Sequence, residues 1–590
     1  MKKVLKNLDA YIAGAMMIVT IVLVIVNVIT RKLFNYIIIW SEEIATSCFV
    51  YSVFIGAAYA YRKHQHVGVD LLVERLPAGA RRAVHLITSA LLVIINGYIT
   101  VLSVQFIQSS WIKRMPITKL PSSVVSTALV IGFGLMTIYS LVIFVKDLKR
   151  QQTRRGGGRM STFLSILPII IALVLYFTGI PIAYALFAAA LTYFGFIDTT
   201  TVPYLLMQKF VTATQSFPFL AIPFFIMCGS IMNYGGISAR LMDFADALTG
   251  HLPGGLAQIN VLLSMLMGGC SGSANADAAM ECKLLVPEME KRGYGKGFSA
   301  AITAASSCVT PIIPPGINLI VYGLIAGASV GQLFAAGYVP GLLMAVALMI
   351  AVALISKKRG YAPSRPRRAT LGEIGRQALK SFWALFFPLG IIMGMRFGIF
   401  TPTEAGGVGV LYCLIVGKFV YKGLKKEHFI PILRETISGT ATVMLIIVSA
   451  TVFGYYLNWE NIPTMLLNAV TSFASNKFLV LLVMNVVLLI VGMFLEGGAA
   501  LIILAPLMVP IVKAAGIDLV HFGIVCNVNI MIGGLTPPFG SMMFTCVSIT
   551  GCKMQEFIKE CVPFIIALLI ALLLLTYIPG ISMLIPNLIY

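Results

Sequence analysis

The chain has 590 residues, of which 59% are hydrophobic and only 11% are charged. Soluble domains carry about 25% charged residues, so this composition excludes a water-soluble globular protein and predicts a polytopic membrane protein. The net charge of +21 fits basic loops on the cytoplasmic side of a membrane, and no nucleic-acid partner is expected. The cysteines are scattered and form no CxxC pair or Cys/His cluster, so no metal or redox cofactor is predicted.

Four apolar runs predict an N-terminal module of four membrane-spanning helices over residues 1–146. Lysines and arginines concentrate at its two ends and in the loop between the second and third runs. By the positive-inside rule, both ends of this module should be cytoplasmic. A basic, glycine-rich stretch at 147–160 has the composition of a flexible linker. The predicted spans lie near residues 11–30, 43–60, 84–106 and 122–145.

The rest of the chain contains an internal repeat. One constant shift along the sequence brings Val286-Pro287 onto Val509-Pro510 and Pro314-Pro315 onto Pro537-Pro538. Basic clusters mark the cytoplasmic loops, and an odd number of predicted crossings separates equivalent loops of the two halves. The halves should therefore be inverted, as in many secondary transporters. We expect a first repeat at 161–355, a basic cytoplasmic connector at 356–380 and a second repeat at 381–590.

The predicted fold class is an all-α polytopic membrane protein. It combines the N-terminal four-helix module with inverted structural repeats, each of which contains an apolar helix pair broken at small residues and a Pro-interrupted helix. Four breaks rich in glycine, proline and small polar residues interrupt the apolar runs, at 268–280, 309–323, 494–500 and 529–540. Irregular backbone at membrane depth is tolerated only where it lines a cavity or is buried in protein.

These breaks are the predicted binding sites. Unwound carbonyls can replace water around a sodium ion, and the N termini of half-helices can receive a carboxylate. We expect sodium as a coupling ion near Ser271, Thr310, Gly533 and Thr536, with no other cofactor. The candidate substrate- and ion-binding residues are Ser271, Gly272, Ser273, Asn275, Asp277, Thr310, Pro314, Pro315, Gly316, Asn318, Glu496, Gly497, Thr536, Pro537, Pro538, Gly540 and Ser541.

Each candidate also has a purely structural explanation. Small residues at helix crossings usually allow close packing, and Asp277 is as well suited to cap a half-helix as to bind a cation. Glu404 in FTPTEAGG lies at the start of a predicted helix, where a cap or hinge role is favoured over contact with the substrate. The case for binding depends on four breaks at repeat-related places, not on any one residue.

The sequence also bears on two other functions, an intramembrane serine protease and a primary pump or channel subunit. Gly269-Cys270-Ser271-Gly272 matches the G-x-S-G pattern of an intramembrane serine protease with Ser271 as nucleophile. Such a serine needs a general base within hydrogen-bonding reach, and the six histidines lie in loops or at helix ends. The chain contains no G-x-x-x-x-G-K-[ST] loop, so it is not expected to be an ATPase or to use ATP itself.

Several segments resemble the membrane subunits of tripartite ATP-independent periplasmic (TRAP) transporters. LLSMLMGGCSGSANADAA, TPIIPPGINLIVYG, GIFTPTEAGG and GGLTPPFG are similar to the large subunit, and WSEEIATSCFVYSVFIGAAYAYRKHQHVGVDLL is similar to the small subunit. Together they cover nearly the whole chain, as a fused protein. The family usually has a serine where Gly316 stands and a glycine where Thr310 stands.

The resemblance implies a secondary active transporter of the bacterial inner membrane and not an enzyme. It implies sodium-coupled import of an organic acid that a periplasmic substrate-binding protein delivers. It also implies an elevator-type transporter architecture, in which two re-entrant hairpins carry the site across the membrane. Four-carbon dicarboxylates, sialic acid and other sugar acids, and keto acids remain open as substrates. The alternative from the same architecture is a sodium/carboxylate symporter that works without a binding protein.

Overall fold

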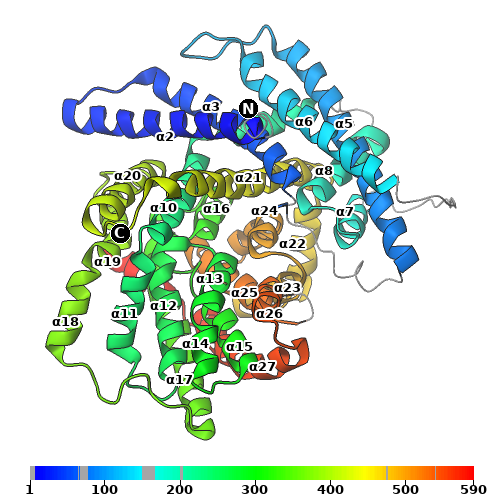
Figure 1. The fold of residues 1–590 in the computed structure, drawn as a ribbon. Coiled ribbons are helices and arrows are strands. Elements are labelled where there is room, and N and C mark those ends of the chain that lie inside the picture. Colours follow the sequence, from blue (N-terminus) through cyan, green and yellow to red (C-terminus); the bar gives the residue numbers. More distant parts are fainter. Residues whose placement is uncertain are drawn as a thin grey trace. The chain divides into compact units, whose positions relative to one another are not determined.

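The computed structural model of the chain describes residues 7–63, 65–66, 78–148, 167–198, 204–473, 476–537 and 540–590. Within them, eleven helices are long and apolar enough to cross a membrane, or twelve if the bent pair α18 (Leu371–Lys380) and α19 (Phe382–Arg396) forms one span. The prediction of an all-α polytopic membrane protein is confirmed (Figure 1). Most of the linker predicted at 147–160 lies outside the described residues.

The helices form two compact units, the first made of residues 1–223 and 433–462. The four N-terminal spans predicted from the sequence are confirmed as α2 (Leu8–Phe34), α3 (Ile39–Arg62), α5 (Ala78–Ser110) and α6 (Ser122–Leu148). The other elements of this unit are α7 (Leu167–Phe177), α8 (Ile182–Thr192), the π-helix η1 (Tyr193–Ile197), α9 (Leu205–Thr214), the 3-10 helix η2 (Phe217–Leu220) and most of α21 (Phe429–Trp459).

Helix α21 packs against the N-terminal helices even though it lies far from them in sequence. Ile437 of α21 is buried with Ala13 of α2 and Ile55 of α3. A Cβ atom at Gly56 would lie 2.9 Å from Ile437 Cγ2, so the glycine allows α3 to approach α21 closely. The unit therefore combines the N-terminal module with a long helix from the repeat region.

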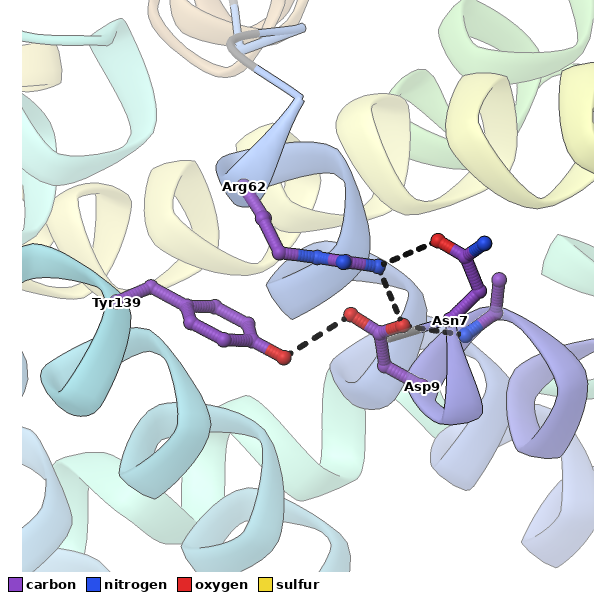
Figure 2. A network of polar contacts seen from close by, with 5 residues as sticks. Asn7, Asp9, Arg62 and Tyr139 are labelled. Atoms are coloured by element: carbon purple, nitrogen blue, oxygen red, sulfur yellow. Dashed lines mark hydrogen bonds and ion pairs between the residues drawn. The ribbon is translucent and has the colours of Figure 1, made fainter. Parts of the chain in front are cut away.

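A buried ion pair joins three helices at one end of the N-terminal module (Figure 2). Arg62 Nη2, at the end of α3, donates to Asp9 Oδ1 of α2 at 2.7 Å and to Asn7 Oδ1 at 3.2 Å. Tyr139 Oη of α6 donates to Asp9 Oδ2 at 3.1 Å. Because Asp9 is only 6% exposed, its pairing with Arg62 offsets the cost of burying a carboxylate.

The second unit comprises residues 224–432 and 463–590. Its predicted helix cap at Glu404 is confirmed: Thr401 N donates to Glu404 Oε2 at 2.8 Å, and Glu404 N donates to Thr401 Oγ1 at 3.4 Å. The helices of this unit not yet named are α10 (Ala221–Tyr234), α11 (Ile237–Thr249), α12 (Gly255–Ser271), α13 (Ala274–Leu284), α14 (Val286–Lys291), α15 (Lys296–Ser306), α16 (Ile317–Ala326), α17 (Val330–Arg359), α20 (Pro402–Ile415), η3 (Val416–Val420), η4 (Lys426–His428), α22 (Ile462–Phe473), α23 (Lys477–Phe494), α24 (Gly497–Ala514), α25 (Leu519–Leu535), α26 (Ser541–Thr550), α27 (Met554–Tyr577) and α28 (Pro579–Ile589).

The helix boundaries of this unit recur at the same constant shift that aligns Val286 with Val509, and positions related by this shift are equivalent in the two repeats. Helix α12 ends at Ser271, and α23 ends at the equivalent position, Phe494. Helices α13 and α24 begin at equivalent positions, and so do α15 and α25. The starts of α16 and α26, and of α17 and α27, differ from this shift by one residue. The sequence repeat is therefore also a repeat of secondary structure.

The two repeats pack against each other reciprocally. Helix α13 of the first repeat lies against α26 of the second, and α16 lies against α24. Under the shift α13 corresponds to α24 and α16 to α26, so each hairpin contacts the Pro-loop helix of the other repeat. The equivalent helices α17 and α27 also pack against each other, and Arg359 at the end of α17 pairs with Glu560 near the start of α27 at 2.8 Å, so the two helices run antiparallel.

Candidate functional site

The first hairpin tip lies against the first Pro-Pro loop. Helix α12 ends at Ser271, and α13 begins at Ala274, so the break is shorter than the predicted 268–280. Gly272 between them has φ +59, and a Cβ atom there would lie 3.0 Å from the carbonyl oxygen of Pro315. A glycine is needed at this position for both reasons, since other residues rarely adopt this conformation and would crowd the loop.

The first Pro-Pro loop, between α15 and α16, is packed from several sides. A Cβ atom at Gly316 would lie 2.1 Å from the carbonyl oxygen of Pro311. A Cβ atom at Gly337 of α17 would lie 2.1 Å from the carbonyl oxygen of Ile312. A serine at position 316 would therefore not fit this conformation of the loop.

The second hairpin tip meets a residue of the first repeat. Glu496 is the N-cap of α24, and its Oε2 accepts from Gly498 N at 3.1 Å and from Ala499 N at 3.3 Å. Asn318, at the start of α16, faces this tip: its Nδ2 and Oδ1 each lie 3.7 Å from Cβ atoms built on Gly497 and Gly498 respectively. The structure thus brings three of the predicted site residues together and gives Glu496 a capping role.

The second Pro-Pro loop starts where α25 ends. Thr536 has extended backbone, and its hydroxyl donates to the carbonyl of Ile532 at 2.7 Å. A Cβ atom at Gly540 would lie 2.5 Å from the carbonyl oxygen of Gly534, so the chain turns back tightly on the helix end. Gly533 approaches α23 closely, and Ser541 begins α26. Pro537 is described as part of the turn after Thr536, whereas Pro538 lies outside the described residues.

A buried polar cluster lies behind the first hairpin tip. Thr310 Oγ1 donates to Asp277 Oδ2 at 2.7 Å, and Ser264 Oγ donates to Glu281 Oε2 at 2.8 Å. Asp277 and Glu281 are 1% and 0% exposed, and no described lysine, arginine or histidine forms an ion pair with either. Asp277 Oδ1 and Glu281 Oε1 make no hydrogen bond among the described residues. Of the two roles considered for Asp277, the structure shows no capping bond to α13.

Glu281 is a site residue that the sequence interpretation missed. It stands four residues after Asp277, so the two carboxylates lie on the same face of α13. Two acidic residues four positions apart in a predicted half-helix were the feature of the sequence that could have indicated this cluster. The equivalent positions of the second repeat hold Ala500 and Leu504, so only the first repeat carries buried acids here. Asn275, also on α13, has a buried Oδ1 without a hydrogen bond among the described residues.

In the second repeat, hydrogen bonds between uncharged side chains join α23, α25 and α27. Asn485 Nδ2 of α23 donates to Thr576 Oγ1 at 2.9 Å, and Asn529 Nδ2 of α25 donates to Asn485 Oδ1 at 2.6 Å. In the first repeat, Ser306 of α15 donates to Asn260 of α12 at 2.8 Å. Ser306 and Asn529 occupy equivalent positions, whereas their partners Asn260 and Asn485 do not. The two bonds therefore share one equivalent residue, on the helix that follows each hairpin.

The described residues contain no group of three or more His, Cys, Asp and Glu side chains that could hold a metal ion. The potential ligands at the hairpin tips and Pro-Pro loops are instead carbonyls, hydroxyls and the Asp277 carboxylate. These are oxygen ligands of the kind that hard cations prefer. The membrane spans and the repeated helix breaks define a multi-pass membrane protein with an internal repeat.

Comparison with known proteins identifies the family. Residues 20–150 match the DctQ component and residues 169–581 match the DctM component of tripartite ATP-independent periplasmic transporters. The chain therefore belongs to the TRAP transporter family, as a fused permease that is a secondary transporter of the inner membrane and not an enzyme. The protease alternative at Ser271 is not supported.

Named relatives have the same fused or large-subunit organisation. The chain is 32% identical to the sialic acid TRAP transporter permease protein SiaT of Haemophilus influenzae, over 99% of each chain. It is 34% identical to the isethionate TRAP transporter permease protein DctMQ of Oleidesulfovibrio alaskensis, over 92% of this chain and 88% of that protein. It is 38% identical to the C4-dicarboxylate large permease protein DctM of Pseudomonas aeruginosa, over 64% of this chain and 88% of that protein.

Proposed function

We propose that this permease imports an organic acid by sodium-coupled secondary transport. The observation that carries the proposal is the reciprocal contact of the two repeats at their breaks. Helix α13 of the first repeat lies against α26 of the second, and α16 lies against α24. At the second tip, Asn318 at the start of α16 lies against Gly497 and Gly498. The names of the relatives, which include sialic acid, isethionate and C4-dicarboxylates, support an organic acid as substrate.

In this proposal sodium binds at both breaks. Near the first tip, the carbonyls around Ser271 and the Thr310 loop hold one ion, and the buried negative charge of Asp277 favours a cation there. Near the second tip, the carbonyls around Gly533 and Thr536 hold another. The amide of Asn318 and the N termini of α16 and α26 then offer hydrogen-bond donors to a substrate carboxylate.

The proposed movement is that of an elevator, in which the hairpins and Pro-Pro loops cross the membrane as one body. The segments at roughly 215–330 and 436–550, which contain all four breaks, are the candidates for that body. Since α21 packs into the core of the N-terminal module through Ile437, we assign its 433–459 portion to the static part instead. A periplasmic binding protein delivers the substrate in this scheme.

The experiment is uptake into proteoliposomes that contain the full chain and its cognate binding protein. We expect uptake of the binding protein's organic acid only with an inward sodium gradient, and loss of uptake for Asp277→Ala with normal amounts of folded protein. Uptake that ignores the sodium gradient would refute the coupling. Uptake that persists without the binding protein would instead support the binding-protein-independent symporter.

A further inference from the structure

An apolar groove runs along the outer surface between α17 and α27. It has a volume of about 500 Å³ and is lined by alanine, leucine, isoleucine and proline side chains. Its rim residues are well exposed: Leu354 on α17 is 67% exposed, and Ile566 and Ile570 on α27 are 52% and 55% exposed. In a membrane protein such aliphatic side chains face the hydrocarbon of the bilayer.

The length of the groove matches one leaflet. Its lining extends from Ala347 to Ile355 on α17 and from Pro563 to Ile570 on α27. At 1.5 Å per residue these stretches are about 12 Å and about 10 Å long. One leaflet of the hydrocarbon core is about 15 Å thick. The groove is therefore suited to a lipid acyl chain and too short for a membrane-spanning helix.

Only one end of the groove is charged. One helical turn beyond Leu354 come Lys357 and Lys358, and one turn before Pro563 comes Lys559. The nearby carboxylate of Glu560 is already neutralised by Arg359 at 2.8 Å. The described structure shows no ion pair for any of the three lysines. The opposite end continues into leucines on α27, so a ligand there would need an anionic head at the lysine end and an apolar tail.

We infer that this groove binds one anionic phospholipid of the cytoplasmic leaflet. An acyl chain lies in the groove, and the phosphate lies at the basic end near Lys358 and Lys559. The basic connector that follows α17 places this end on the cytoplasmic side. Because α17 and α27 belong to different repeats, the lipid bridges the two halves that carry the hairpins. Helix α17 also contacts the first Pro-Pro loop through Gly337, so lipid binding stabilises the body that holds the site.

The test uses the full-length permease in nanodiscs of phosphatidylcholine with or without phosphatidylglycerol. We expect phosphatidylglycerol to be retained in native mass spectra and to raise the thermal midpoint. The double variant Lys358→Gln/Lys559→Gln should weaken phosphatidylglycerol binding about 25-fold, at about five-fold for each lysine near the surface. The matched control, Lys425→Gln/Lys426→Gln, removes two exposed charges elsewhere and should leave binding unchanged.

A second pair of variants tests the apolar part of the site. Ala567→Phe fills the groove and should abolish lipid retention, whereas Leu573→Phe, which enlarges an exposed residue of α27 outside the lining, should not. Equal retention of phosphatidylglycerol by wild type and both test variants would overturn the proposal and indicate a nonspecific lipid annulus. A lysine-independent dimer in native mass spectra, lost in Ala567→Phe, would overturn it in favour of a second copy of this chain as occupant.

Discussion

Replacing Thr310 by valine tests the buried cluster behind the first hairpin tip. Valine keeps the volume of threonine but removes the hydroxyl that donates to Asp277 Oδ2 at 2.7 Å. Both residues are essentially inaccessible, with exposures of 0% and 1%, so water does not replace the lost donor. The hydroxyls of Ser264 and Ser307 lie near the carboxylate, yet Asp277 Oδ1 makes no hydrogen bond among the described residues.

The expected size of the effect follows from the charge of the acceptor. A hydrogen bond to a charged group contributes about 1.5–3 kcal/mol, against about 1 kcal/mol for a neutral one. We therefore expect Thr310→Val to lower the free energy of unfolding by about 2 kcal/mol. We also expect it to weaken stabilisation by sodium, because the carboxylate would no longer be held in place for the ion.

The assay is thermal unfolding of the purified permease in detergent, measured across a sodium titration with choline as the replacement cation. Thr451→Val is the matched control, because its hydroxyl only bonds the carbonyl of Ile447 in its own helix at 2.8 Å; its loss should matter little. If Thr310→Val unfolds like the control and responds to sodium like wild type, the carboxylate does not depend on this donor and the reasoning about the cluster is wrong.

Three further substitutions test the packing and the second tip. Gly337→Ala should destabilise the permease by about 1–3 kcal/mol and reduce uptake, because the new Cβ would lie 2.1 Å from a carbonyl oxygen of the first Pro-Pro loop. Thermal unfolding and uptake assays measure the two effects. An unchanged melting temperature and unchanged uptake would contradict the close contact. Gly132→Ala should destabilise the N-terminal module similarly, since its Cβ would lie 2.7 Å from the Phe54 backbone. Its control, Gly134→Ala, has open space and should be neutral or stabilising in the same melt. Glu496→Ala should cost about 1 kcal/mol through loss of the α24 cap, whereas Glu496→Gln retains an acceptor oxygen; equal melts for the two would argue against capping.

Much of the architecture is determined by local sequence. Runs of about twenty apolar residues have no alternative to membrane-spanning helices, so the four N-terminal spans could be predicted within a few residues. The repeat was visible because prolines and glycines fix backbone breaks at constant spacing. The cap at Glu404 follows from a short motif whose two hydrogen bonds form within four residues.

The candidate site depended on tertiary structure wherever its partners come from different elements. Sequence spacing does not reveal that Asn318 faces the second tip at Gly497. Nor does it reveal that Thr310 donates a hydrogen bond to Asp277, or that Glu281 lies in the same buried cluster. These contacts join α16 with α24 and the loop after α15 with α13, and only the packed bundle sets their distances. The same holds for α21, whose sequence predicts a span but whose place in the N-terminal core is decided by how Ile437 fits against Ala13 and Ile55. The length of an apolar run specifies a membrane-spanning helix. Which helix packs beside it depends on how the side-chain surfaces of the two helices fit together.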